Sequence, residues 1–332
     1  MPAGIMNWGS RTFKAGKFRL QNGVTFLDGD GFPSSGTTGT GIGMPVGSVY
    51  VDKNEGTMFV NESSTLASPY WTPVSVNQAG IVGVKTDFAG AVGRLGTATT
   101  ASSLDANVAG LRYFGAGIEE NDATNTIQAI TYPVGGPLLT MITENQADKL
   151  TALGYGHTTA LWTPATNGVM VIDVNFTGIT DIITRSIFLG FTGETAEAMA
   201  PPVAGATTTL TFNATGTQGD NVHGLFMDSR MTAASTVFLP SVKANAAASV
   251  TATTAALTVA STVAAAATYQ RWRMEIDAAG NIRAFINKVE VKKVATGAST
   301  SVALSPAFAQ SNTTTTAALS LGVRSFGTWA AR

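Results

Sequence analysis

Apolar and polar side chains alternate strictly between residues 268 and 294, TYQRWRMEIDAAGNIRAFINKVEVKKV. The large apolar residues of the first run share one side of a period-two pattern: Trp272, Met274 and Ile276. The charged residues of that run share the other side: Arg271, Arg273, Glu275 and Asp277. This period is typical of a β-strand with one face against a core and the other toward solvent.

A turn and two further strands are expected after this run. Gly280 and Asn281 lie in the segment 277–281, and both residue types tolerate the positive φ that a tight turn needs. The apolar positions of the next two runs are Ile282, Ala284, Ile286, Val289 and Val291. We therefore expect a three-stranded β-meander whose charged face is wet.

Many short strand-like runs, separated by Gly, Asn and Asp, fill most of the remaining chain. They are AGIVGV, GLRYFGAGI, NTIQAITYPV, GVMVIDVNFTGI, RSIFLGFTG, TTLTF, VHGLFMDSR and STVFLPSV. One segment, residues 143–154, predicts a helix instead, because Thr143 and Gln146 match a capping box, Leu150 and Leu153 face inward and Gly154 ends the run. The fold class is therefore predicted as all-β: an N-terminal arm and hairpin, then an antiparallel β-sandwich with one short helix.

The first 80 residues have a different texture. Residues 1–30 form a weakly basic arm that is too apolar for a permanently solvated tail, and residues 31–47, rich in Gly, Ser and Thr, predict a flexible linker. Residues 48–61 predict a β-hairpin, which is marginal alone in water and needs a neighbour. Tyr70 and Trp71 follow in an extended segment that offers aromatic surface.

These differences predict two domains. Residues 1–80 comprise the arm, linker and hairpin, and residues 81–332 comprise the sandwich. The border itself is open between about 80 and 115, because the intervening residues suit either side.

Composition narrows the classes of function. Only 12% of the residues are charged, about half the usual ~25%, which suits a protein packed against copies of itself or a partner. The net charge of −1 gives no reason to expect nucleic acid as a partner. The absence of cysteine excludes disulfides and thiolate metal sites. No secretory signal is visible, and no membrane span is expected from the uncharged but Thr- and Ser-rich window 244–270.

Two resemblances add to this picture. The pattern YQRWRMEIDAAGNIRAFINKVEV resembles the core hairpin of concanavalin-A-like (laminin-G-like) jelly rolls, with Asn287-Lys288 in place of the usual Asp-Gly. This resemblance implies that a jelly roll covers about residues 110–332. The segment GMPVGSVYVDKNEGTMFVNESSTLASPYWTPV is similar to segments of tailed-phage virion proteins.

Together the resemblances imply a capsid decoration or head-fibre-like protein of a bacteriophage. Such a protein is expected on the capsid exterior, bound to the major capsid protein through its N-terminal region. We expect a homotrimer, because an icosahedral shell offers three-fold positions. The residues expected to anchor it are Trp8, Arg11, Phe13, Lys14, Lys17, Phe18 and Arg19.

Two other classes stay open. A receptor-binding fibre would grip host glycan with exposed aromatic residues, for which Trp162 and Trp329 are candidates, whereas Trp272 patterns as core. A carbohydrate-active enzyme would need paired carboxylates. Glu275 and Asp277 lack the third acid of the glycoside hydrolase strand motif, so we expect no enzymatic activity.

No cofactor or metal is expected. Lectins of this architecture bind calcium through clustered oxygen ligands, and several residues could contribute here, but no spacing singles them out. They are Asp173, Asn175, Asp181, Asp220 and Asn221.

Overall fold

Among the residues that it describes, the computed structural model contains 24 β-strands and one short α-helix, so the protein is nearly all-β. The described residues are 17–20, 23–75, 80–86, 112–114, 127–131, 138–143, 150–154, 162–177, 184–193, 203–206, 209–213, 221–231, 236–238, 241–242, 249–253, 258–262, 269–314 and 319–331. The chain separates into two compact units, Met1–Gly80 and Ile81–Arg332. We call them the N-terminal unit and the large unit.

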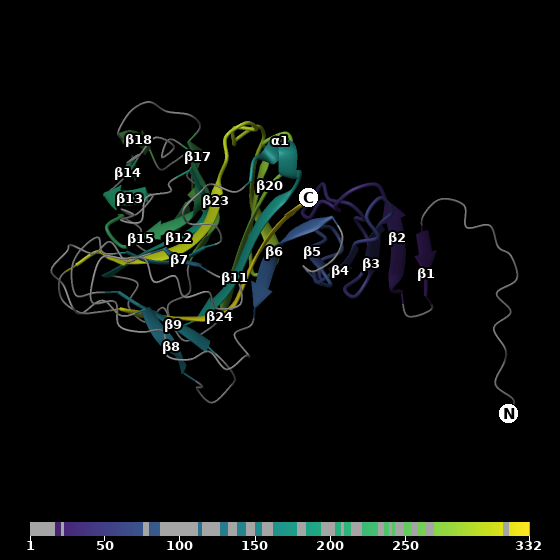
Figure 1. Cartoon of the computed structure of the whole chain (residues 1–332), viewed down its shortest axis with the longest axis horizontal. Helices are drawn as coiled ribbons and strands as arrows, with labels where there is room; N and C mark the ends of the chain where they lie inside the picture. Colours follow the sequence, from purple (N-terminus) through teal and green to yellow (C-terminus); the bar gives the residue numbers. More distant parts are fainter. Residues whose placement is uncertain are drawn as a thin grey trace, which may run out of the picture. The chain divides into compact units, whose positions relative to one another are not determined.

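The N-terminal unit is built on a five-stranded sheet (Figure 1). Its strands, in spatial order, are β1 (Lys17–Arg19), β2 (Thr25–Gly29), β3 (Val49–Asp52), β4 (Met58–Asn61) and β5 (Trp71–Pro73). β2 and β3 run parallel, and the other neighbours run antiparallel. The predicted hairpin is therefore confirmed as β3–β4, and the neighbours that it needs are β2 and β5.

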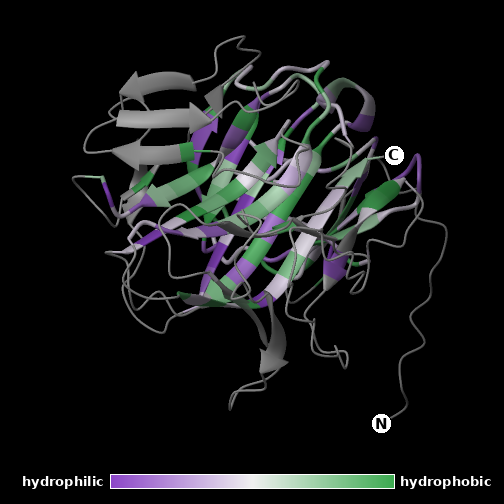
Figure 2. Cartoon of the chain, turned by 60° about the vertical axis from the view of Figure 1, so that its left-hand side comes forward, coloured by the Kyte–Doolittle hydropathy of each residue, from purple (hydrophilic) through white to green (hydrophobic). Residues whose placement is uncertain are grey.

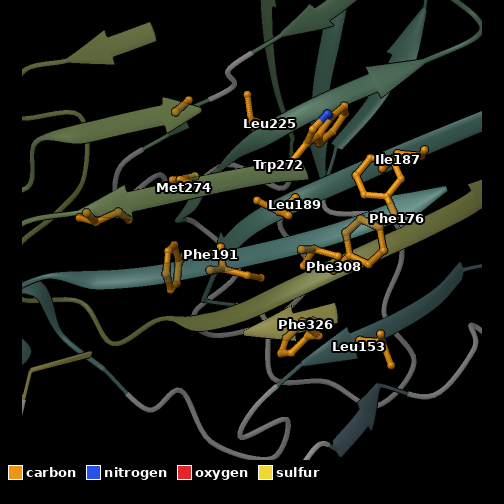
Figure 3. Packing of buried hydrophobic residues seen from close by; sticks show 14 of the residues in the cluster. Leu153, Phe176, Ile187, Leu189, Phe191, Leu225, Trp272, Met274, Phe308 and Phe326 are labelled. Carbon is orange, nitrogen blue, oxygen red and sulfur yellow. The ribbon is translucent and has the colours of Figure 1, made fainter. Parts of the chain in front are cut away.

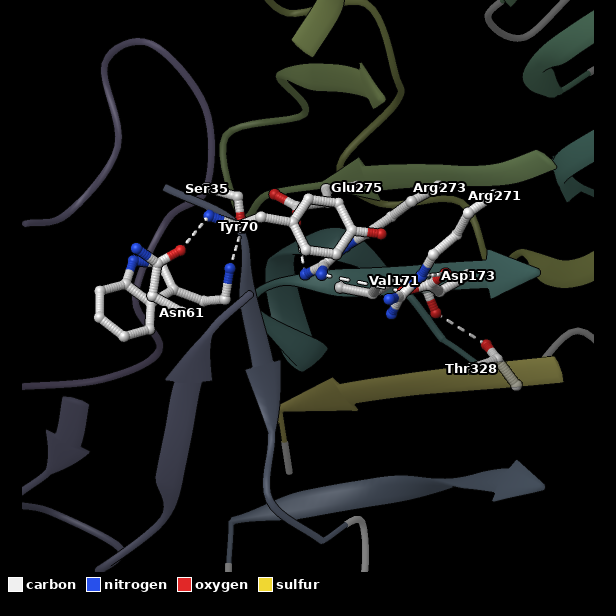
Figure 4. Close-up of polar contacts among 10 residues, drawn as sticks. Ser35, Asn61, Tyr70, Val171, Asp173, Arg271, Arg273, Glu275 and Thr328 are labelled. Carbon is white, nitrogen blue, oxygen red and sulfur yellow. Dashed lines mark hydrogen bonds and ion pairs between the residues drawn. The ribbon is translucent and has the colours of Figure 1, made fainter. Parts of the chain in front are cut away.

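The segment expected to be a flexible linker is instead a packed loop of this unit. Trp71 N–H donates to Ser35 Oγ at 3.1 Å, and the Trp71 indole donates to Thr40 O at 2.8 Å. Asn61 Nδ2 donates to Met44 O at 3.0 Å, while its Oδ1 accepts from Tyr70 N at 2.9 Å (Figure 4). The linker prediction was wrong because composition does not show that buried side chains supply partners for the loop's backbone. Tyr70 and Trp71 are buried, so the expected aromatic surface is wrong as well.

The large unit contains two extensive antiparallel sheets and a small one (Figure 1). The first has the order β19-β16-β15-β12-β23-β10-β7, with β17 on β15. Its strands are β7 (Arg112–Phe114), β10 (Leu150–Gly154), β12 (Arg185–Thr192), β15 (Val222–Asp228), β16 (Thr236–Phe238), β17 (Ser241–Val242), β19 (Thr258–Thr262) and β23 (Ser305–Asn312).

The second sheet has the order β22-β21-β20-β11-β24-β9-β8, with β6 on β24. Its strands are β6 (Ile81–Thr86), β8 (Ile127–Thr131), β9 (Leu138–Ile142), β11 (Met170–Thr177), β20 (Gln270–Ile276), β21 (Ile282–Ile286), β22 (Val289–Val294) and β24 (Ser320–Ala331). The small sheet joins β13 (Val203–Ala206), β14 (Thr209–Asn213) and β18 (Ser249–Thr253).

A single apolar core lies between the two large sheets (Figure 3). Phe176, Trp272 and Met274 come from the second sheet, whereas Leu189 and Phe308 come from the first. The rings of Phe176 and Trp272 meet edge to face with centroids 5.3 Å apart, a favourable geometry for aromatic pairs. Figure 2 shows hydrophobic and hydrophilic residues succeeding one another along these strands, as a sandwich with one inner face per sheet requires.

The prediction of a helix over 143–154 is wrong at its C-terminal end. Its last part, Leu150–Gly154, is strand β10, which pairs with both β7 and β23. Leu153 does face the core, but as part of a sheet. Five residues that suit either state became a strand because two neighbouring strands offer hydrogen bonds on both sides. The helix of the described residues is α1 (Pro164–Asn167), one turn long with Pro at its start.

The predicted β-meander is confirmed as β20–β21–β22. Gly280, with φ of 76°, closes the first turn, in which Asp277 Oδ1 accepts from the N–H groups of Ala279 and Asn281. The second turn is Asn287-Lys288, and both residues have positive φ, at 51° and 69°. That conformation matches the right-handed twist of the flanking strands in a two-residue hairpin loop.

Candidate functional site

A group of four charged side chains lies on the side of β11 and β20 that faces away from the core. Asp173 on β11 lies directly opposite Arg273 on β20 and diagonally from Arg271. Arg271 Nε and Nη2 each donate to a separate Asp173 oxygen at 2.7 Å, and Arg273 Nη1 lies 3.9 Å from Oδ2 (Figure 4). A two-point guanidinium–carboxylate contact is the strongest form of side-chain ion pair.

Arg273 extends this group to a second carboxylate and to two aromatic rings. Its Nη2 lies 2.6 Å from Glu275 Oε1, and its guanidinium carbon lies 5.2 Å from the Trp329 ring centroid and 6.0 Å from that of Phe285. Only 3% of the Arg273 side chain is exposed. We call Asp173, Arg271, Arg273 and Glu275 the charged cluster.

The burial of Asp173, Arg273 and Glu275 corrects the prediction of a wet charged face. The alternation in the sequence assigned these side chains to the correct side of β20, opposite Trp272. It could not show that Arg273 lies against Trp329, because that residue comes from β24, which is distant in sequence. Glu275 lies opposite Arg283 in the register and forms an ion pair with Arg273.

Glycines make room for the Trp329 indole. A Cβ added to Gly83 on β6 would lie 2.7 Å from Trp329 Cβ, and one added to Gly327 would lie 2.9 Å from Trp329 Cζ3. Both distances are too short for real carbon contacts, so these two positions exclude a side chain. The ring on which Arg273 stacks is thus fixed by neighbouring backbone.

Glu275 and Asp277, the two carboxylates considered for catalysis, both make other contacts in this structure. Glu275 is buried and paired with Arg273, and Asp277 accepts hydrogen bonds within its own turn. Asp173, a candidate calcium ligand, is balanced by Arg271. Within the described residues no group of three or more His, Asp or Glu side chains is placed to hold a metal ion. Asp181 and Asp220 lie outside the described residues.

The two tryptophans expected to stack on sugar are buried. Trp162 belongs to the core and pairs through its backbone with Leu304. Trp329 is only 1% exposed and lies beside Arg273. Neither ring therefore presents a face to a ligand in this structure. Residue type alone indicated these two tryptophans, and it does not show which other side chains cover a ring. Trp272 is in the core, as predicted.

Exposed apolar side chains are concentrated in the N-terminal unit. Of the nine large ones that are exposed in the described residues, seven belong to Met1–Gly80: Leu20, Phe26, Ile42, Val46, Met58, Leu66 and Val74. The other two are Tyr269 and Val289. Large apolar groups that gather on a surface are the usual mark of an interaction site.

Some of these side chains share one face of the five-stranded sheet. Phe26 lies beside Val49, which lies opposite Val60, and in the next row Val51 lies opposite Met58. Val74 continues the second row, because its N–H donates to Met58 O at 2.9 Å. We call these six residues the apolar rows. Tyr50 and Phe59 alternate with them and are buried, so both faces of the β3–β4 hairpin are apolar.

Sequence reasoning missed this surface, although the signal was present. The runs SVYV and MFV are apolar at consecutive positions, whereas a strand with one wet face alternates. The proposed anchoring residues Lys17, Phe18 and Arg19 form β1 at the edge of the same sheet. The other four, Trp8, Arg11, Phe13 and Lys14, lie outside the described residues.

Acidic residues gather near the turn at one end of this sheet. Asp28 and Asp30 both lie near Lys53 Nζ, at 3.9 and 3.4 Å, and Asp52 Oδ1 accepts from Gly31 N–H at 2.9 Å. The Tyr50 hydroxyl donates to Gly31 O at 2.9 Å. Burial first, and then the charges of Asp52, Asp30 and Asp28, raise the pKa of Tyr50 from 10.0 to about 12.

Comparisons with known proteins bear on the fold. No protein-family model matches the chain, and no curated protein matches it. A protein of unknown function from Shewanella oneidensis MR-1 is similar in structure, with a TM-score of 0.46 and 11% identity over 78% of this chain and 89% of that one.

Two sugar-related proteins are also similar in structure. The Emp46p carbohydrate recognition domain has a TM-score of 0.41 and 6% identity over 71% of this chain and 95% of that one. Endo-1,3-beta-glucanase from Streptomyces sioyaensis has a TM-score of 0.40 and 13% identity over 78% and 99%. The strand pairing itself defines an all-β protein whose large unit is an antiparallel β-sandwich.

No helix in the described part of the chain has the length and apolar character that crossing a membrane requires.

Proposed function

We propose that this protein is a structural component of a tailed-phage virion that decorates or cements the capsid. Its N-terminal unit binds the major capsid protein, and the jelly roll is the part that projects. The observation that carries the proposal is the concentration of exposed apolar side chains in the N-terminal unit. The similarity of residues 43–74 to virion proteins and the low charge of the chain support the same assignment.

The apolar rows supply the binding energy in this proposal. Phe26, Met58 and Val74 are 40%, 41% and 59% exposed, so each has apolar surface left to bury. Burial contributes roughly 25 cal/mol per Å² before the costs of ordering and association. Asp28 lies beside Val51, and Lys53 Nζ, 3.9 Å from its carboxylate, offsets part of its negative charge. The surface therefore suits an uncharged, apolar partner.

The free edge of the sheet offers a second contact. β1 pairs only with β2 among the described strands, so its other side can accept a strand from a neighbouring protein. A homotrimer placed on three-fold positions of an icosahedral shell would present three such units at once. Multivalent attachment raises the effective affinity without new contacts.

Co-sedimentation with empty capsids of the phage whose virion contains this protein tests the proposal. We expect stoichiometric binding that falls at least about tenfold in Met58→Asp and Val74→Asp, because each places a charge on the apolar rows. Val289→Asp is the matched control, since Val289 is 51% exposed but belongs to the large unit. Failure of the wild-type protein to bind capsids, or equal loss in all three variants, would contradict the proposal. Light scattering would test the trimer separately.

A further inference from the structure

An exposed arginine and an exposed tyrosine meet on the outer face of the second sheet of the large unit. The guanidinium carbon of Arg324 lies 5.1 Å from the centroid of the Tyr269 ring. Arg324 is exposed, and Tyr269 is 41% exposed. Tyr269 is one of only two large apolar or aromatic side chains exposed in the described part of the large unit.

The pair spans a strand that carries polar groups. Tyr269 directly precedes β20 and Arg324 lies on β24, whereas β11 separates these two strands. Arg324 is the extra residue at the irregularity where Asn175 pairs with Ser325 and Phe176 pairs with Val323. Asn175 also lies opposite Arg271. The bulge thus places Arg324 on β24 at the point where the Asn175–Ser325 pair adjoins it.

The Arg324 guanidinium has N–H donors that can bind a ligand. A guanidinium carries five N–H donors in a rigid fork that matches a carboxylate. Among the described residues the Arg324 side chain makes no ion pair or hydrogen bond, and its contact is with the Tyr269 ring. Arg271, by contrast, is neutralised by Asp173. The ring restricts the Arg324 side chain, which lowers the entropy that a ligand would have to remove.

We propose that Arg324, Tyr269 and Asn175 form a binding site for a sugar that carries a carboxylate. Arg324 binds the carboxylate at two points, the open part of the Tyr269 ring packs against the apolar side of the pyranose, and Asn175 hydrogen-bonds a ring hydroxyl. The site lies on the large unit and does not depend on the proposed attachment through the N-terminal unit. A binding site on the projecting part would let a decorated particle hold acidic glycans.

Titration calorimetry with two acidic probes tests this site and separates the two sources of such a sugar. 3′-Sialyllactose carries a sialic acid and is compared with lactose, and trigalacturonic acid carries uronic acids and is compared with maltotriose. We expect binding of at least one acidic probe and at least about tenfold weaker binding of its neutral counterpart, because a charge-assisted contact is lost.

Variants decide whether these residues are responsible. We expect Arg324→Gln to weaken binding of the acidic probe at least about tenfold, and Tyr269→Ala to weaken it by a smaller factor. Lys293→Gln removes an exposed positive charge elsewhere on the same sheet and is expected to leave binding unchanged. Thermal melting of each variant checks that it is folded. No binding of either acidic probe, equal binding of the neutral sugars, or full binding by folded Arg324→Gln would overturn the proposal.

Discussion

Arg271 and Asp173 form a two-point ion pair that runs diagonally across the β20–β11 strand pair, with both N–O distances at 2.7 Å. Asp173 is 5% exposed and also lies near the buried Arg273, so one carboxylate serves two arginines. Removing a partner from a buried ion pair leaves an uncompensated charge, which costs far more than the loss of a surface pair.

Asp173→Asn should therefore destabilise the large unit by about 3 kcal/mol. Denaturant unfolding followed by tryptophan fluorescence measures the change. Lys293→Gln, which alters an exposed charge on β22, should change stability by less than about 0.5 kcal/mol. Similar losses in the two variants would mean that the buried pair has no special role.

Gly83→Ala should destabilise the large unit by about 1–3 kcal/mol, the usual cost of overpacking. The new methyl group would meet the backbone and Cβ of Trp329, which cannot move away as a flexible side chain could. Differential scanning calorimetry would detect the lower melting temperature. An unchanged melting temperature would show that β6 can shift relative to β24.

Lys288→Gly should stabilise the β21–β22 hairpin by about 0.5–1 kcal/mol, the relief of the left-handed backbone less the entropy cost of glycine. Lys288 has a φ of 69°, a conformation that glycine adopts without a steric penalty. The same change at Lys292, within β22, should destabilise the protein, because glycine weakens the interior of a strand. Chemical unfolding of both variants compares the two effects, and a loss of stability in Lys288→Gly would contradict the turn geometry.

The N-terminal unit should lose stability in alkali. The folded pKa of Tyr50, about 12, lies above its unfolded value of 10.0, so folding favours the neutral phenol. This contribution is complete below pH 10 and is lost as the pH rises through about 12. Unfolding of the wild-type protein across this range is compared with that of Tyr50→Phe, which should show a smaller loss between the two pH values. Identical pH dependence in the two proteins would argue against the raised pKa.

The fold was predictable from sequence where a pattern was local. The alternation around Trp272 and the Asn287-Lys288 step identified the meander, since period and turn chemistry are both written within a few residues. The segment 150–154 was assigned to a helix because its partners, β7 and β23, are distant in sequence. The loop 31–47 was assigned to a linker for the same reason, because Trp71 and Asn61 hold it.

The candidate sites depend still more on long-range contacts. Arg324 and Tyr269 are separated by 55 positions, and only the order of β20, β11 and β24 brings them together. Trp162 and Trp329 were selected because their residue type suits sugar stacking, but burial is decided by what covers a ring. The apolar rows needed the parallel β2–β3 pairing, which no local pattern indicates.

Strand β24 lies inside its sheet, with β11 on one side and β9 and β6 on the other, although it comprises residues 320–331. During translation, β6 and β11 leave the ribosome long before the strand that joins them. Until β24 is made, the edges of β6 and β11 with which it pairs lack this partner, and unpaired strand edges favour aggregation. The second sheet is therefore incomplete until residues 320–331 have been made, and a product truncated before them would lack the strand that joins β6 to β11.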